Sequence, residues 1–172
     1  MKVEYLFSNN KKCGSRLISW AAKYENLGLI DNPSHVAVLL NENMVIESTF
    51  TTGVRIIPYT KWLEINNEIA KIPCDRSYRK SMDVFKELTS LWGRSYDWKG
   101  ISFFALSYVK LIMFKEPMPE VNSWNNKDSY FCTEFVAILS GCACSMHSPA
   151  KLLKEMIDVK TKPNKCTTKN QS

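Results

Sequence analysis

The stretch from residue 34 to residue 49 constrains the fold most, because it predicts a β-hairpin. Residues 34–40 and 44–49 are two short segments of mainly apolar and β-branched residues. Between them lies Asn41-Glu42-Asn43, whose polar residues are typical of a tight connection. The sequence therefore predicts two antiparallel strands joined by a three-residue loop.

The loop length sets the register of this hairpin. It pairs Leu40 with Met44, Ala37 with Glu47, and His35 with Thr49. Because side chains alternate along a strand, His35 and Glu47 then lie on one face of the hairpin. They are diagonal neighbours with Cα atoms roughly 7–8 Å apart, so their side chains can meet. A slip of one residue would place them on opposite faces.

The rest of the chain alternates short strands with helices. Further strands are predicted at residues 1–7, 54–59 and 68–73. Apolar spacing predicts helices at residues 15–24, 77–92, 101–114, 132–141 and 149–156, with a helical turn at 59–63. Ser15 and Ser148 are the expected N-caps of two of these helices. We expect one α+β domain over residues 1–159, a small antiparallel sheet packed on helices, and a basic, disordered tail over residues 160–172.

The composition indicates the class of protein and the compartment to expect. The 172 residues carry a net charge of +6 and are 45% hydrophobic, which is ordinary for a globular protein. No hydrophobic export segment is evident, and the apolar stretch 101–114 contains Lys110 and is shorter than the roughly 20 residues of a membrane span. We expect a cytoplasmic protein whose six cysteines are mainly free thiols, without a transmembrane segment and with no nucleic-acid partner.

Cys132 begins the apolar helix that ends near Gly141. The start of a helix has unpaired N–H groups and the positive end of the helix dipole, and both favour a thiolate. A thiolate attacks carbonyl carbon when a histidine exchanges the proton and a third group orients that histidine. His35 and Glu47 are the candidates for these two roles, since a glutamate in an apolar strand is costly to bury without a partner.

Two neighbours of Cys132 have weaker claims. The hydroxyl of Tyr130 is a candidate donor to the substrate or to an oxyanion, although an aromatic residue packed at a helix entry is an equal alternative. Glu134 lies in the first helical turn, where it favours the dipole, so a structural role is expected. The backbone N–H of Cys132 is a natural oxyanion donor.

Four short motifs carry a family resemblance: Ser34-His-Val-Ala-Val, Val45-Ile-Glu, Tyr96-Asp-Trp and Tyr130-Phe-Cys-Thr-Glu-Phe-Val. Their order resembles that of the permuted papain-like amidases and peptidases of the YaeF/YiiX type. These are circularly permuted relatives of the NlpC-type cysteine peptidases and of lecithin:retinol acyltransferase-like enzymes.

The resemblance covers roughly residues 30–155, and the first segment, Met1-Lys-Val-Glu-Tyr-Leu-Phe, departs from the Gly-Asp entry common in the family. It implies a circularly permuted papain-like fold, with Cys132 as nucleophile, His35 as general base and Glu47 as its orienting partner. It further implies a cysteine hydrolase that cleaves an amide, peptide or ester bond through an acyl-enzyme, or an acyltransferase. The substrate would be a peptide, an amide or a lipid acyl group, and no cofactor or metal is expected.

Three alternatives remain open at this point. Cys132, Cys142, Cys144 and His147 are residue types that bind zinc, although they lack the usual C-x2-C spacing. The same fold could serve as a non-catalytic module whose pocket for an acyl chain or peptide is lined by Phe103, Phe104, Tyr108 and Phe114. Finally, Cys13 could pair with His35 in the unpermuted order, with only 22 residues between the two positions.

Overall fold

The computed structural model describes residues 2–10, 13–74, 86–87, 89–119, 123–124, 129–140 and 148–161. Within these ranges, residues 13–14, 137–140 and 159–161 are described by their backbone alone.

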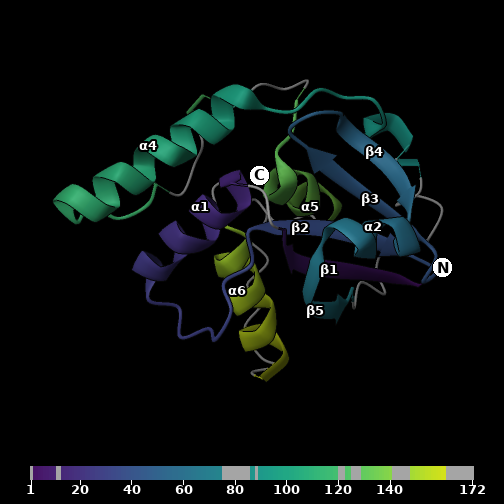
Figure 1. Cartoon of the computed structure of the whole chain (residues 1–172), viewed down its shortest axis with the longest axis horizontal. Helices are drawn as coiled ribbons and strands as arrows, with labels where there is room; N and C mark the ends of the chain where they lie inside the picture. Colours follow the sequence, from purple (N-terminus) through teal and green to yellow (C-terminus); the bar gives the residue numbers. More distant parts are fainter. Residues whose placement is uncertain are drawn as a thin grey trace, which may run out of the picture.

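A five-stranded antiparallel sheet forms the centre of the molecule, in the order β4-β3-β2-β1-β5 (Figure 1). The strands are β1 (Val3–Asn9), β2 (His35–Leu40), β3 (Met44–Thr49), β4 (Gly53–Pro58) and β5 (Asn67–Pro73). The α+β class is therefore confirmed. All five predicted strands are present, and β1 begins and ends two residues later than predicted.

The predicted hairpin register is present. Leu40 pairs with Met44, Leu39 with Val45, and Val38 with Ile46. The turn bends through Asn41 and Glu42, whose φ angles are 48° and 64°. Asparagine tolerates this left-handed region better than most residues, which explains its place in the loop.

Helices cover both faces of the sheet. On one face, α5 (Cys132–Ser140) and α6 (Pro149–Thr161) pack Phe135, Val136, Leu152 and Leu153 against the strands. On the other face, α2 (Tyr59–Ile65) inserts the fully buried Trp62 among Leu6, Ala37, Leu39 and Val45. Because both faces are covered, the central strands are apolar on both sides, and a buried carboxylate such as Glu47 is exceptional there.

Two helices begin earlier than predicted. The first, α1 (Cys13–Ala22), is followed by a 3-10 turn at Lys23–Glu25, so Ser15 lies inside the helix and is not its N-cap. The Ser15 Oγ instead accepts a hydrogen bond from the Asn10 backbone N–H at 3.1 Å.

The helix expected from residue 101 is α4 (Trp98–Phe114), and its cap explains the earlier start. The Asp97 Oδ1 accepts a hydrogen bond from the Gly100 N–H at 2.9 Å, so Tyr96-Asp97-Trp98 is the entry to the helix.

The last helix begins as predicted and ends later. Pro149 is its first residue, and the Ser148 Oγ accepts a hydrogen bond from the Lys151 N–H at 3.0 Å. The helix continues to Thr161, beyond the expected end of the domain at residue 159, and the tail from 162 to 172 lies outside the described residues.

Of the predicted helix 77–92, residues 86–87 and 89–91 are helical, whereas 77–85 and 88 lie outside the described residues. None of the helices in the described ranges has the length and apolar character needed to cross a bilayer.

Candidate active site

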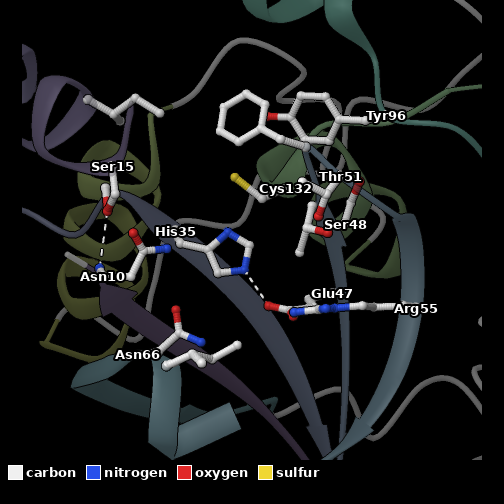
Figure 2. A pocket seen from close by; sticks show the side chains of 15 residues that line it. Asn10, Ser15, His35, Glu47, Ser48, Thr51, Arg55, Asn66, Tyr96 and Cys132 are labelled. Atoms are coloured by element: carbon white, nitrogen blue, oxygen red, sulfur yellow. Dashed lines mark hydrogen bonds and ion pairs between the residues drawn. The ribbon is translucent and has the colours of Figure 1, made fainter. Parts of the chain in front are cut away.

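The structure brings His35, Glu47 and Cys132 to one pocket of about 260 Å³ (Figure 2). His35 is the first residue of β2, Glu47 lies in β3, and Cys132 is the first residue of α5. The pocket therefore lies where β2 begins and β3 is close to its end, with the start of α5 reaching over it.

Glu47 is the most completely bonded residue of the site. Its side chain is 1% exposed, and its Oε2 accepts hydrogen bonds from the His35 Nε2 at 2.8 Å and the Trp62 Nε1 at 3.1 Å. Its Oε1 accepts from the Arg55 Nε at 2.8 Å and from the Arg55 Nη2 at 2.5 Å. Such multiple donation is what makes a buried carboxylate tolerable.

These contacts fix the charge of Glu47. Burial alone raises the pKa of a carboxyl group, but hydrogen bonds and opposite charges from His35 and Arg55 outweigh it and lower the pKa of Glu47 to about 2. Glu47 is thus a carboxylate throughout the neutral range, and it accepts the proton that His35 carries on Nε2.

His35 lies between Glu47 and Cys132. Burial lowers the pKa of its imidazole, but hydrogen bonds to Cys132 and Glu47 and the negative charge of both outweigh burial and raise the pKa to about 10. Because Nε2 faces Glu47, the other ring nitrogen, Nδ1, lies on the side of the Cys132 sulfur (Figure 2). The arrangement therefore favours the protonated imidazolium form of His35 at neutral pH.

The start of α5 is tied to the sheet by backbone contacts. The Ser48 hydroxyl of β3 donates to the Tyr130 carbonyl at 2.5 Å, and the Tyr130 N–H donates to the Ser95 carbonyl at 3.1 Å. Within the first turn, the Glu134 Oε2 accepts from the Phe131 N–H at 3.3 Å, a capping contact that supports the structural role expected for it. The start of α5 is therefore held beside β3 through Tyr130, two residues before Cys132.

Tyr130 does not line the pocket. Its half-buried side chain packs against the core formed by the sheet, α5 and α6. The tyrosine that does line the pocket is Tyr96, whose hydroxyl is on the Cys132 side of its ring (Figure 2). Sequence reasoning used Tyr96 only as part of a motif and gave it no role.

A close backbone approach places Tyr96. The Val54 N–H donates to the Arg94 carbonyl at 2.9 Å, and the Gly93 N–H donates to the Val54 carbonyl at 3.0 Å. Gly53 has a φ of 65°, and a Cβ there would lie 2.1 Å from the Arg94 oxygen, so only glycine permits this contact. Burial raises the pKa of Tyr96, as do the charges of Cys132, Glu134 and Asp97, so the hydroxyl keeps its proton.

Arg55 and Trp62 are also residues that sequence reasoning missed. Arg55 stands directly opposite Glu47 in the pairing of β3 with β4, so extending the register by one strand would have found it. Trp62 reaches Glu47 from α2, across the layer between helix and sheet, and no local pattern indicates that contact.

The remaining pocket wall is partly apolar, from Ile18, Phe50 and Ile65. The aromatic residues proposed from sequence as a pocket lining do not contribute to this one. Phe104 and Tyr108 are buried against Ala21 of α1 with Phe103 beside them, and Phe114 is exposed.

The two other cysteine arrangements are not assembled by the part of the chain that the structure describes. No group of three or more metal-ligating side chains occurs among those residues, and Cys142, Cys144 and His147 lie outside them. Cys13 begins α1, but its side chain is likewise outside the description.

Comparisons with protein-family models, curated proteins and solved structures found no match to this chain.

Proposed function

We propose that this protein is a cysteine hydrolase that cleaves an amide, peptide or ester bond through an acyl-enzyme on Cys132. One observation carries the proposal. The Nε2 of His35 is fixed by the buried Glu47 carboxylate, which leaves Nδ1 directed at the Cys132 sulfur. That is the geometry of a nucleophile, its acid–base partner and an orienting group.

In the first step the Cys132 thiolate attacks the substrate carbonyl carbon, and the carbonyl π electrons move to oxygen. When the tetrahedral intermediate collapses, the carbon–leaving group bond breaks and the His35 imidazolium gives its proton to the departing amine or alcohol. The products of this step are a thioester on Cys132 and a neutral imidazole still bonded to Glu47.

In the second step His35 takes a proton from water, the resulting hydroxide attacks the thioester carbon, and the sulfur leaves as thiolate. The imidazolium–thiolate pair is restored, and the acid is released. An amine or alcohol in place of water would give acyl transfer by the same sequence, so hydrolase and acyltransferase differ only in the acceptor.

In the proposed mechanism, two donors stabilise the oxyanion. Cys132 is the first residue of α5, so no carbonyl of the helix accepts a hydrogen bond from its N–H. The Tyr96 hydroxyl is the second donor in the proposed arrangement, because it remains protonated and lines the same pocket. Preorganised donors of this kind contribute about 10²- to 10³-fold in rate each.

The permuted papain-like fold belongs to this proposal. Its support is the order of the elements: an antiparallel sheet carries His35 and Glu47 first, and the helix bearing Cys132 follows. A reducing compartment, such as the cytoplasm expected from sequence, would keep Cys132 as the free thiol that the mechanism needs.

Chromogenic acyl probes test the chemistry without knowledge of the natural substrate. We expect p-nitrophenyl esters and p-nitroanilides of short and medium acyl chains to leave an acyl group on Cys132, detected by mass spectrometry of the intact protein and its peptides. Cys132→Ala and His35→Ala should each lower turnover by at least about 1,000-fold while the circular dichroism spectrum is unchanged.

Cys74→Ala is the matched control. Cys74 is a free, half-buried cysteine whose sulfur lies 3.0 Å from the Tyr5 hydroxyl, and it does not line the pocket. Its loss should leave turnover unchanged. Full activity in Cys132→Ala refutes the mechanism, and slow, equal alkylation of all cysteines by iodoacetamide favours a non-catalytic binding module.

A further inference from the structure

The outer side of α4 carries an apolar stripe that no described element covers. Trp98, Leu106, Val109 and Met113 are 58%, 44%, 47% and 68% exposed, and they recur at helical spacing. Phe114, next to Met113, is 65% exposed. The opposite side of the same helix is buried through Phe104 and Tyr108. The helix therefore has apolar side chains on both its buried side and its exposed side. Exposed apolar patches of this kind mark interaction surfaces.

The charged side chains on α4 itself have one sign. Lys99 and Lys110 are exposed on α4, and Lys115 caps its C-terminal end. None of the 17 residues of α4 is acidic. An apolar stripe with lysines along it, and with a tryptophan at one end, is the pattern of a helix that lies in the interface of an anionic bilayer.

The stripe leads to the candidate active site. The Trp98 ring lies 5.3 Å from the Phe50 ring and 5.6 Å from the Tyr96 ring, measured between centroids. Phe50 and Tyr96 line the pocket that contains Cys132. Figure 1 shows α4 extending to the periphery of the molecule, away from the sheet. A surface that contacts this stripe would therefore reach the mouth of the pocket at Trp98.

The charges also discriminate between partners. A second copy docked through the same face would bring Lys99 and Lys110 against an α4 with no acidic residue, so self-association places like charges together. A bilayer containing phosphatidylserine supplies negative charge along the whole length of the stripe, and lysines near such a surface strengthen the binding.

We propose that the exposed face of α4 docks on the surface of an anionic lipid bilayer, with the helix lying in the plane of the interface and the pocket opening beside it. Trp98, Val109 and Met113 enter the headgroup region, and Lys99 and Lys110 contact lipid phosphate and carboxylate groups. The proposal does not rest on the proposed chemistry, because a protein without the Cys132 thiol keeps the same surface.

Vesicle co-sedimentation of the full chain carrying Cys132→Ala tests this surface apart from catalysis. The protein should sediment with vesicles of phosphatidylcholine containing about 30% phosphatidylserine and much less with phosphatidylcholine alone. Raising the salt concentration should weaken the binding, because it screens the lysines.

Two double variants separate the contributions. Met113→Gln with Phe114→Gln should lower the partition coefficient at least about 10-fold, since it removes buried apolar area from the interface. Lys99→Glu with Lys110→Glu should abolish the preference for phosphatidylserine. The matched control is Leu63→Gln with Ile157→Gln, which changes exposed apolar residues on α2 and α6 and should bind like the parent.

Three results would overturn the proposal: no sedimentation with either vesicle, equal binding to both, or equal losses in the control variant. A dimer in light scattering that Met113→Gln with Phe114→Gln dissociates, together with absent vesicle binding, would assign the face to a second copy. Binding of an acidic protein by this face, with no affinity for lipid, would likewise replace the bilayer as its partner.

Discussion

The two halves of the candidate site are held in different ways. His35, Glu47 and Arg55 come from three consecutive strands, and a chain of hydrogen bonds between side chains joins them. Cys132 and Tyr96 come from segments far from these strands in sequence, and backbone contacts and aromatic packing place them. Hydrogen bonds between charged side chains hold the residues of the sheet half. Backbone hydrogen bonds and aromatic packing hold those of the helix half.

Because of this difference, substitutions in the two halves should have different effects on catalysis. Changes in the sheet half alter the charges around His35 and so its proton affinity. A change at Tyr96 in the helix half alters the donation to the oxyanion, but it adds or removes no charge in contact with the imidazole. Measurements of rate and of pH dependence together should therefore tell the two halves apart.

After the removal of Cys132 or His35, the largest effect is expected from Glu47→Gln. The amide cannot be an anion, so the variant loses a group that raises the pKa of His35 to about 10. The alkaline limb of kcat/KM, which in the parent reports loss of the imidazolium near that value, should move to lower pH. Activity at neutral pH should fall by about 100-fold or more, because the imidazole loses its orienting anion.

A pH–rate profile with an acyl p-nitrophenyl ester measures both effects. Glu64→Gln is the control, because Glu64 is exposed on α2 and does not line the pocket. An unshifted alkaline limb in Glu47→Gln would show that the carboxylate does not act through His35.

Tyr96→Phe tests the helix half. It should lower kcat by about 100-fold, the cost typical of losing one oxyanion donor, and leave the alkaline limb in place. Tyr108→Phe is the control, since Tyr108 is also buried but its hydroxyl donates to Glu25, away from the pocket. If Tyr96→Phe lowers kcat no more than Tyr108→Phe does, Tyr96 is not an oxyanion donor.

The sheet half was largely predictable from sequence, and the reason is locality. The alternation of apolar residues and a three-residue loop set the hairpin register, and the structure has that register from Leu40–Met44 to Val38–Ile46. The register then placed His35 and Glu47 side by side, where their side chains meet at 2.8 Å.

The helix half was predictable only in part. The helix of Cys132 follows from apolar spacing, but the place of Tyr96 depends on contacts between distant segments. The Val54 N–H bonds to the Arg94 carbonyl beside Gly53, and Ser95 pairs with Ser129 in an isolated β-bridge. No periodic pattern in the sequence predicts contacts between such distant segments. The sequence therefore indicates Tyr130, which is near Cys132 along the chain, as the candidate donor and gives no sign of a role for Tyr96.

The smallest effect is expected at Arg55, which lines the pocket and binds the Glu47 carboxylate. The guanidinium holds one carboxylate oxygen with two nitrogens, at 2.8 and 2.5 Å, and is itself 30% exposed. Arg55→Lys keeps the charge but loses the paired contact, so kcat should fall by about 10-fold or less with KM little changed. Arg55→Met also removes the charge and should cost more, and partial rescue by lysine would identify Arg55 as a positioning residue.

Stability measurements give Arg55 a second signature. Since the folded pKa of Glu47 is lowered to about 2, its ionised form stabilises the fold above the ordinary carboxyl pKa of 4.5, and this contribution is lost as the pH falls toward 2. Arg55→Met weakens the lowering, so the parent should exceed the variant in free energy of unfolding at neutral pH, with a gap that narrows below pH 4.5. Urea unfolding across this range measures the gap, and a constant difference at every pH would mean that Arg55 contributes through packing and not through the charge of Glu47.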